Sequence, residues 1–394
     1  MSSHVDPERH AQLQAAMRAS GHAAVFAWRA EELVLTTSGL PHLGLSFCLY
    51  PASGEPVAYL FALEPDDTTP AAVMRRRYNL LPAQDLQAWD ELKGMIVEDA
   101  RSLGCGDGPI AYARHVARTV PFGNSAEAPP LTTAVIEYLL SDARPTDDSS
   151  FFANQALHKT AREIERIRRA NDVAAIGLRA FYESLQPGNT EVQVASVIES
   201  AIQTQTGRNG IGLARGWAFV QGGPNAALAG TFSRSSAYAL ETGDIVVVEL
   251  ATCVDGYWSD LTRAGVVGAP NEKQAALLAA VREAQEAAIR AVRVGTVCGE
   301  VDQAARALLN ERGYGAGFTH FTGHQVGFRY HDAGPTLEVG SSARLEAGMV
   351  VTIEPGVYGK EFGGGARFED NVLVTENGPV LLSPHELMGA QVRG

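Results

Sequence analysis

The sequence lacks any run of about 18 apolar residues of the kind that a membrane-spanning helix needs, although 45% of its 394 residues are hydrophobic. Its first residues, MSSHVDPERH, are polar and contain no apolar h-region. These absences predict neither a membrane span nor a secretory signal. We therefore expect a cytoplasmic protein with no membrane partner.

Cysteine and positive charge are also scarce. The four cysteines, at positions 48, 105, 253 and 298, are widely scattered and form no CxxC pair, which predicts reduced, buried thiols rather than disulfides or a zinc knuckle. The formal net charge is -13, whereas a nucleic-acid partner needs a basic face. We expect no nucleic-acid partner, and we expect a metal ion to hold part of the acidic excess.

The chain is long enough for two domains. The first part predicts a helix at 5–20, four strands at 23–28, 33–36, 45–50 and 56–63, and a helix at 86–103. Prolines at 121, 129 and 130 and the segment SDARPTDDSS (141–150) are typical of a linker. The boundary is therefore expected near residue 150, between an α/β domain at 1–150 and a second domain at 151–394.

The second part begins with predicted helices at 158–185 and 191–205, the latter with Thr190 and Gln193 at the spacing of a capping box. A strand at 214–221 and a loop of small residues at 222–230 come next, and helices follow at 272–294 and 300–312. The remainder consists of loops and strands in which short polar residues cluster around glycines, at 319–335, 349–359 and 363–378. Such segments suit binding sites, because glycine lets the backbone approach a ligand closely.

The segment GDIVVVELATCVDGYWSDLTR (243–263) predicts a β-hairpin, because Asp255-Gly256 is a two-residue turn signal between apolar runs. A turn centred there places residue 249 opposite 262 and residue 251 opposite 260. Glu249 and Asp260 then share one face of the hairpin as diagonal neighbours.

Ile245, Val247, Cys253 and Trp258, the neighbours on that face, are apolar, so two carboxylates there are costly unless they are paired or bound to a cation. The alternative is that both acids are solvated, or are paired with arginines such as Arg263. Glycine-rich and apolar segments downstream add three residues of similar chemistry. The five candidate ligands are Glu249, Asp260, His324, Glu354 and Glu369.

Four carboxylates and one imidazole form a hard, oxygen-dominated ligand set. Such a set suits Mn(II), Fe(II), Co(II) or Zn(II) in a paired site better than it suits a structural zinc. Two cations about 3.5 to 4 Å apart can share bridging carboxylates and activate water. The ligand set therefore predicts hydrolysis.

Four motifs, GDIVVVELATCVDGYWSDLTR, HFTGHQVGFRYHD, LEAGMVVTIEPGVY and ARFEDNVLVTENG, occur in the order and spacing of the M24 family. That family includes methionine aminopeptidase, aminopeptidase P, prolidase and creatinase. The chain resembles it over residues 157–385. The spacing of His320, His324 and His331 is similar to that of the aminopeptidase P and prolidase branch, as is LVLTTSGLP (33–41).

The resemblance implies an α+β protein with a pita-bread catalytic domain, two divalent metal ions (Mn, Co, Zn or Fe) and a homodimer. It implies a Xaa-Pro dipeptidase or aminopeptidase that cleaves short peptides. Asp260 and Glu369 would bridge the metals, with Glu249 and His324 as further ligands. Glu354 would be both a ligand and the general base. The remaining implied catalytic or substrate-binding residues are His320, His331, Arg367 and Tyr358.

Two positions depart from the family pattern. The first aspartate ligand is replaced by Glu249, and the histidine that follows the GPN loop is replaced by Gly230. Creatinase and ectoine hydrolase are family members understood to cleave C–N bonds without metal. A similar metal-independent hydrolase of a small zwitterionic amide, with Glu249 as nucleophile or acid-base group, is therefore an alternative, and a non-catalytic binding module is a second.

Overall fold

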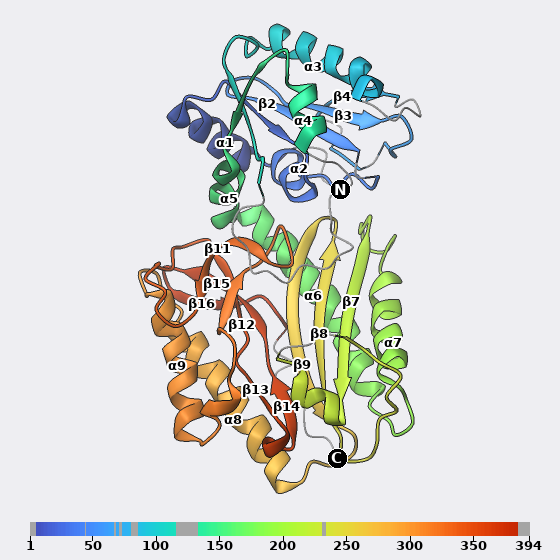
Figure 1. Ribbon diagram of the computed structural model, residues 1–394, viewed down its shortest axis with the longest axis vertical. Helices are drawn as coiled ribbons and strands as arrows, with labels where there is room; N and C mark the ends of the chain where they lie inside the picture. The colour runs from blue at the N-terminus through green and yellow to red at the C-terminus, as the bar shows by residue number, and fades with distance from the viewer. Residues whose placement is uncertain are drawn as a thin grey trace. The chain divides into compact units, whose positions relative to one another are not determined.

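The computed structural model describes residues 5–43, 45–66, 68–70, 73–79, 86–115, 133–230 and 234–384. The prolines at 121, 129 and 130 lie outside these ranges. The chain divides into two compact units, Met1–Ala156 and Leu157–Gly394 (Figure 1). Across the described ranges, no helix is long and apolar enough to cross a membrane.

The first unit contains a six-stranded sheet in the order β4-β3-β2-β1-β5-β6. Phe26, Phe47, Tyr78 and Trp89 contact one another through their rings in the core of this unit. The strands are β1 (Ala24–Ala27), β2 (Ser46–Pro51), β3 (Val57–Phe61), β4 (Met74–Tyr78), β5 (Pro109–Tyr112) and β6 (Arg144–Asp147). The helices are α1 (Pro7–Ser20), α2 (Ala30–Thr37), α3 (Asp90–Ser102), α4 (Thr133–Leu139) and α5 (Ser149–Leu157).

Two predictions for this unit are wrong. The apolar run 33–36 lies in helix α2, not in a strand, because Glu32 accepts hydrogen bonds from the N–H groups of Trp28 and Arg29 and so starts a helix. A short apolar run does not by itself distinguish a buried helix from a buried strand. The segment 141–150 is not a linker, since it contains β6, which pairs with β5 at the edge of the sheet.

The second unit contains a three-stranded sheet, β7-β8-β9, a five-stranded sheet, β11-β10-β12-β15-β16, and the pair β13-β14. Their bounds are β7 (Ala214–Gly222), β8 (Ile245–Val254), β9 (Tyr257–Val266), β10 (Gly323–Gln325), β11 (Asp332–Leu337), β12 (Val350–Ile353), β13 (Gly356–Gly359), β14 (Gly364–Arg367), β15 (Asp370–Thr375) and β16 (Gly378–Leu381). The helices are α6 (Ala161–Glu183), α7 (Glu191–Gln203), α8 (Glu272–Ala291) and α9 (Cys298–Glu311).

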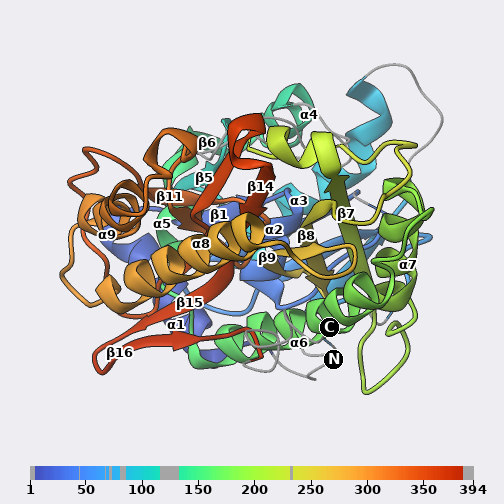
Figure 2. The same ribbon diagram turned by 90° about the horizontal axis from the view of Figure 1, so that it is seen from below.

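Helices cover the outer faces of this unit. Helices α6 and α7 pack on the β7-β8-β9 sheet, and α8 and α9 lie on the side of the five-stranded sheet (Figures 1 and 2). The inner faces of the two sheets are left for the site. The four helices predicted for this part of the chain are present, and the capping box of Thr190 and Gln193 opens α7.

The predicted register of the β8-β9 hairpin is confirmed. Residue 249 lies opposite 262, and residue 251 lies opposite 260. The two sheets meet along β9 and β15, where the side chain of Asn371 binds the backbone N–H and carbonyl of Asp260. The N–H of Glu369 donates to the carbonyl of Thr262 at 3.1 Å. These bonds bring acids that are distant in sequence to one place.

Candidate metal centre

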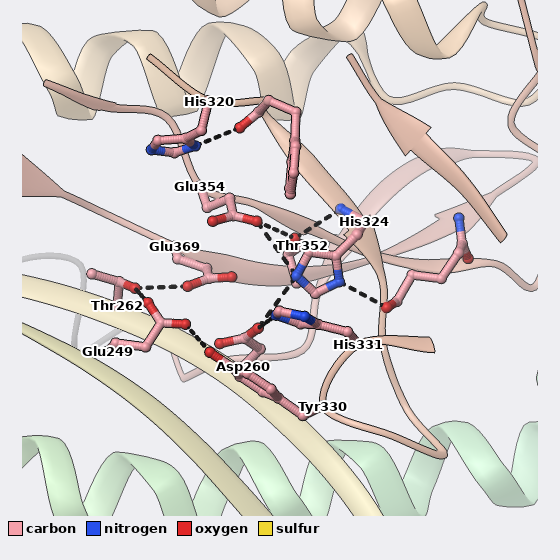
Figure 3. Close-up of polar contacts among 12 residues, drawn as sticks. Glu249, Asp260, Thr262, His320, His324, Tyr330, His331, Thr352, Glu354 and Glu369 are labelled. Carbon is pink, nitrogen blue, oxygen red and sulfur yellow. Dashed lines mark hydrogen bonds and ion pairs between the residues drawn. The ribbon is translucent and has the colours of Figure 1, made fainter. Parts of the chain in front are cut away.

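The five predicted ligands lie together between the two sheets of the second unit (Figure 3). Glu249 is on β8, Asp260 on β9 and His324 on β10, while Glu354 follows β12 and Glu369 precedes β15. Three overlapping groups of these side chains, one including His331, offer ligand atoms within 4.8 Å of one another. The structure therefore places all five in one cluster.

Asp260 is the most isolated of the acids. Its side chain is fully buried, and neither of its oxygens receives a hydrogen bond from any described residue. Burial raises the pKa of Asp260 well above its ordinary value of 3.8, and the charges of Glu369 and Glu354 raise it further. A buried carboxylate without donors is stable only if it is protonated or bound to a cation.

His324 presents its Nε2 atom to two of these acids. Its Nδ1–H donates to the carbonyl of Gln325 at 2.9 Å, which leaves a lone pair on Nε2. Nε2 lies 3.4 Å from Asp260 Oδ2 and 3.4 Å from Glu354 Oε1. Burial lowers the pKa of His324 to about 4, so at neutral pH the ring is uncharged and its Nε2 atom can bind a cation.

Threonine hydroxyls orient the remaining two acids. Thr352 donates to Glu354 Oε1 at 3.2 Å, and Thr262 lies 2.7 Å from Glu369 Oε2. Glu369 Oε1 has no hydrogen-bond donor among the described residues. Burial raises the pKa of Glu369. Burial also raises the pKa of Glu354 well above its ordinary value, and the negative charge of Glu369 raises it further.

This donor set fits a divalent cation. Both oxygens of Asp260 and Oε1 of Glu369 have no donor among the described residues, and Nε2 of His324 carries a lone pair. Carboxylate oxygens and imidazole nitrogen are the ligand types of Mn(II), Fe(II), Co(II) and Zn(II). Arg263, the arginine considered as a partner of the acids, pairs instead with Asp370 at 2.7 Å. Pairing with Arg263 therefore does not account for the acids.

Glu249 is held differently from the other acids. Its Oε1 accepts a hydrogen bond from the Tyr330 hydroxyl, and its Oε2 pairs with the guanidinium of Arg367. Thr262 Oγ1 lies 2.9 Å from the same Oε2. Both oxygens of Glu249 therefore have protein donors.

A chain of polar groups runs from Arg367 to His320. Arg367 Nη1 donates to the Tyr358 hydroxyl at 2.9 Å, and this hydroxyl lies 3.0 Å from His320 Nε2. Because His320 Nδ1 donates to the carbonyl of Phe321, its Nε2 accepts the proton of Tyr358. Burial lowers the pKa of His320 to about 4, which keeps the ring neutral.

The ring of Tyr358 fills the space beside Gly230. A Cβ atom at residue 230 would lie 2.5 Å from the ring Cδ2, and Cβ atoms at Gly356 and Gly365 would also collide with this side chain. A histidine at position 230 therefore does not fit unless the ring of Tyr358 moves. The position of the Tyr358 ring therefore requires a glycine at residue 230.

His331 lies at the edge of the cluster, with Nε2 3.9 Å from Asp260 Oδ2. Its ring stacks on that of Tyr330, with centroids 4.1 Å apart, and contacts the ring of His324, with centroids 4.2 Å apart.

The next residue, Asp332, forms a buried ion pair with Lys159 at 3.2 Å. It also accepts hydrogen bonds from the N–H groups of residues 328 and 329. This pair fixes the loop that carries Tyr330 and His331.

Sequence reasoning did not identify the roles of Thr262, Thr352 and Tyr330. Thr262 was detectable, because the hairpin register already places it opposite Glu249. Tyr330 belongs to a loop whose course no periodicity predicts. Trp258 on the same hairpin is half-buried and stacks on Trp217 with centroids 5.2 Å apart.

Known proteins resemble this chain in sequence and in fold. Residues 165–376 match the model of metallopeptidase family M24. The chain is 38% identical over 228 residues to a Xaa-Pro dipeptidase of Pyrococcus furiosus, an alignment that covers 58% of this chain and 63% of that relative. Among solved structures, it is similar to a prolidase from Pyrococcus furiosus (26% identity, TM-score 0.72, covering 94% of this chain and 99% of the other).

A dipeptidase PepE from Mycobacterium ulcerans is a further structural neighbour, with 28% identity and a TM-score of 0.69. The superposition covers 96% of this chain and 95% of the other. These neighbours confirm the predicted α+β pita-bread fold. The family model covers more than half of the chain, and the site is built on the segments that it matches. The chain therefore belongs to metallopeptidase family M24.

Proposed function

We propose that this protein is a metal-dependent hydrolase that cleaves Xaa-Pro dipeptides and related short peptides. The observation that carries the proposal is the buried group of Asp260, His324, Glu354 and Glu369, in which both oxygens of Asp260 and Oε1 of Glu369 have no donor among the described residues and His324 Nε2 lies 3.4 Å from oxygens of Asp260 and Glu354. These four residues would hold a divalent cation. Such a cation polarises a peptide carbonyl and lowers the pKa of water.

Glu354 is proposed as the general base. Burial raises its pKa, which suits a carboxyl group that must accept and release a proton near neutral pH. Thr352 fixes its orientation. The pocket residues of the proposal are His320, His331, Arg367 and Tyr358. In this role, the neutral ring of His320, the ring of His331 and the Tyr358 hydroxyl would bind the backbone of a short peptide.

The metal-independent alternative requires Glu249 as nucleophile or acid-base group. An ion pair with Arg367 and a hydrogen bond from Tyr330 stabilise its charged form and occupy both of its oxygens. These contacts weigh against an attacking role. A cytoplasmic location is supported by four buried cysteines, none of which is in a disulfide. The homodimer rests only on the resemblance to the prolidase branch, and manganese rests on the hard ligand set.

The proposal is tested by Glu354→Gln with Glu376→Gln as the matched control, because residue 376 is an exposed turn position outside the cluster. Release of proline from Ala-Pro should fall at least about a hundredfold in Glu354→Gln, as expected for loss of a general base, and should not change in Glu376→Gln. A Glu354→Gln protein with undiminished turnover would refute the assigned base. Hydrolysis of small cyclic amides but not of dipeptides would refute the peptidase assignment.

A further inference from the structure

The buried acids of the metal centre differ in their hydrogen-bond donors. Asp260 has no donor on either oxygen, and Glu369 has none on Oε1, among the residues that the structure describes. Glu249, by contrast, has Tyr330 on one oxygen and Arg367 on the other. A cation is needed where carboxylate charge is otherwise uncompensated. Arg367 and Tyr330 stabilise the carboxylate of Glu249, whereas the carboxylate of Asp260 needs a cation.

We infer that this chain holds a single divalent ion, bound by Asp260, His324, Glu354 and Glu369, and that Glu249 is the counter-ion of Arg367 instead of a fifth ligand. The inference rests on the proposed metal-dependent function and concerns the same centre. It replaces the two ions that the sequence resemblance implies with one.

The length of the side chain at position 249 supports this assignment. Glu249 and Asp260 start from neighbouring positions on one face of the hairpin. The additional methylene of glutamate carries the carboxylate past Thr262 to Arg367 on β14 and Tyr330 in the loop before β11. A second ion on Glu249 would have to compete with the guanidinium for the same oxygen, and displacing it would leave a buried arginine without its partner.

One divalent ion together with Arg367 compensates three of the four negative charges that face the cluster. Arg367 in turn remains in place to hold the Tyr358 hydroxyl, at 2.9 Å. Glu249 is thus a positioning residue that acts through Arg367.

The first test measures the stoichiometry of Mn²⁺ on the metal-free wild-type protein by equilibrium dialysis and by electron paramagnetic resonance. We expect binding to saturate at one ion per chain, with the spectrum of an isolated Mn²⁺. Saturation at two tight ions per chain, with the spectrum of a magnetically coupled pair, would overturn the inference. Absence of any tight site would overturn it as well.

The second test compares Glu249→Gln with Asp260→Asn. Glu249→Gln should still bind one ion, with a dissociation constant within about tenfold of wild type, the effect of an outer residue. Asp260→Asn should bind the ion more than about a hundredfold more weakly than wild type, because it removes a residue that binds the ion directly. If Glu249→Gln loses a bound ion, Glu249 is a ligand and the inference is wrong.

Circular dichroism of each protein is the control for folding, because Glu249→Gln removes the carboxylate that pairs with the buried Arg367. The double variant Glu249→Gln/Arg367→Met removes both charges together and should also bind one ion. Ala-Pro hydrolysis, measured in parallel, separates the two proposals. Hydrolysis with two bound ions refutes the single-ion inference alone, whereas one bound ion without hydrolysis refutes the peptidase assignment alone.

Discussion

Replacing Asp260 with asparagine should stabilise the metal-free protein while it abolishes metal binding. The wild-type carboxylate is fully buried and has no donor, so its ionised form is costly in the absence of a cation. Asparagine has nearly the same shape and no charge. Its amide can also donate to His324 Nε2, which lies 3.4 Å from the present Oδ2.

The magnitude follows from the pKa of Asp260. Each unit by which burial raises a carboxyl pKa costs about 1.4 kcal/mol once the pH exceeds the raised value. From the ordinary value of 3.8, the cost at pH 8 therefore cannot exceed about 6 kcal/mol. Because neighbouring groups relax and share protons, we expect Asp260→Asn to raise the free energy of unfolding by about 2 to 4 kcal/mol.

The sign of the pH dependence is fixed by the same shift. Below about pH 4 the carboxyl group is protonated in both the folded and the unfolded state, and it contributes no difference. As the pH rises, the unfolded state ionises first, so the wild type loses stability relative to Asp260→Asn until the raised folded pKa is passed. The advantage of the variant should therefore be largest at pH 8 and should shrink towards pH 5.

The assay is thermal unfolding of both proteins after exhaustive chelation, at pH 8 and at pH 5. For a domain of this size, the expected stabilisation corresponds to an increase of about 5 to 15 °C in Tm at pH 8. Excess Mn²⁺ should raise the Tm of the wild type and leave that of the variant unchanged. A metal-free variant that is less stable than wild type at pH 8 would refute the reasoning, because Asp260 would then be satisfied without a cation.

Two further predictions concern the surroundings of the centre. Lys159→Met should lower the free energy of unfolding by about 3 to 5 kcal/mol, because it leaves the buried carboxylate of Asp332 without its cation. A denaturant titration measures this loss. A loss below about 1 kcal/mol would contradict a structural role for this ion pair. Gly230→His should displace the ring of Tyr358 and lower kcat/KM for Ala-Pro by about tenfold or more. An increase in kcat/KM would instead show that the family histidine fits this site.

The hairpin of the metal centre was predictable in detail because its determinants are local. An Asp-Gly turn between two apolar runs fixes the register, and the register fixes which residues share a face with Asp260. The five candidate residues could be singled out for a related reason, since each interrupts an apolar or glycine-rich segment with a group that is costly to bury. Their meeting in one cluster depends on the contact of β9 with β15, which the family resemblance supplied and residue periodicity did not.

The partners of Glu249 were not predictable. Arg367 was expected in the substrate pocket, and Tyr330 was not singled out. The ion pair of Arg367 with Glu249 joins residues 118 positions apart in the chain, so it depends on tertiary packing. Helix α2 was missed because its short apolar run resembles a strand. The carboxylate of Glu32, which accepts backbone N–H groups at the start of the helix, favours the helix instead. The pKa of that carboxylate is raised to about 8 by burial.

The most direct test of the proposed function is the effect of metal on the hydrolysis of Ala-Pro. The protein is purified without added metal, its metal content is determined, and proline release is measured before chelation, after chelation and after Mn²⁺ is restored. The account predicts that hydrolysis disappears with the metal and returns when the ion is restored. Full hydrolysis by protein that contains no metal would contradict it.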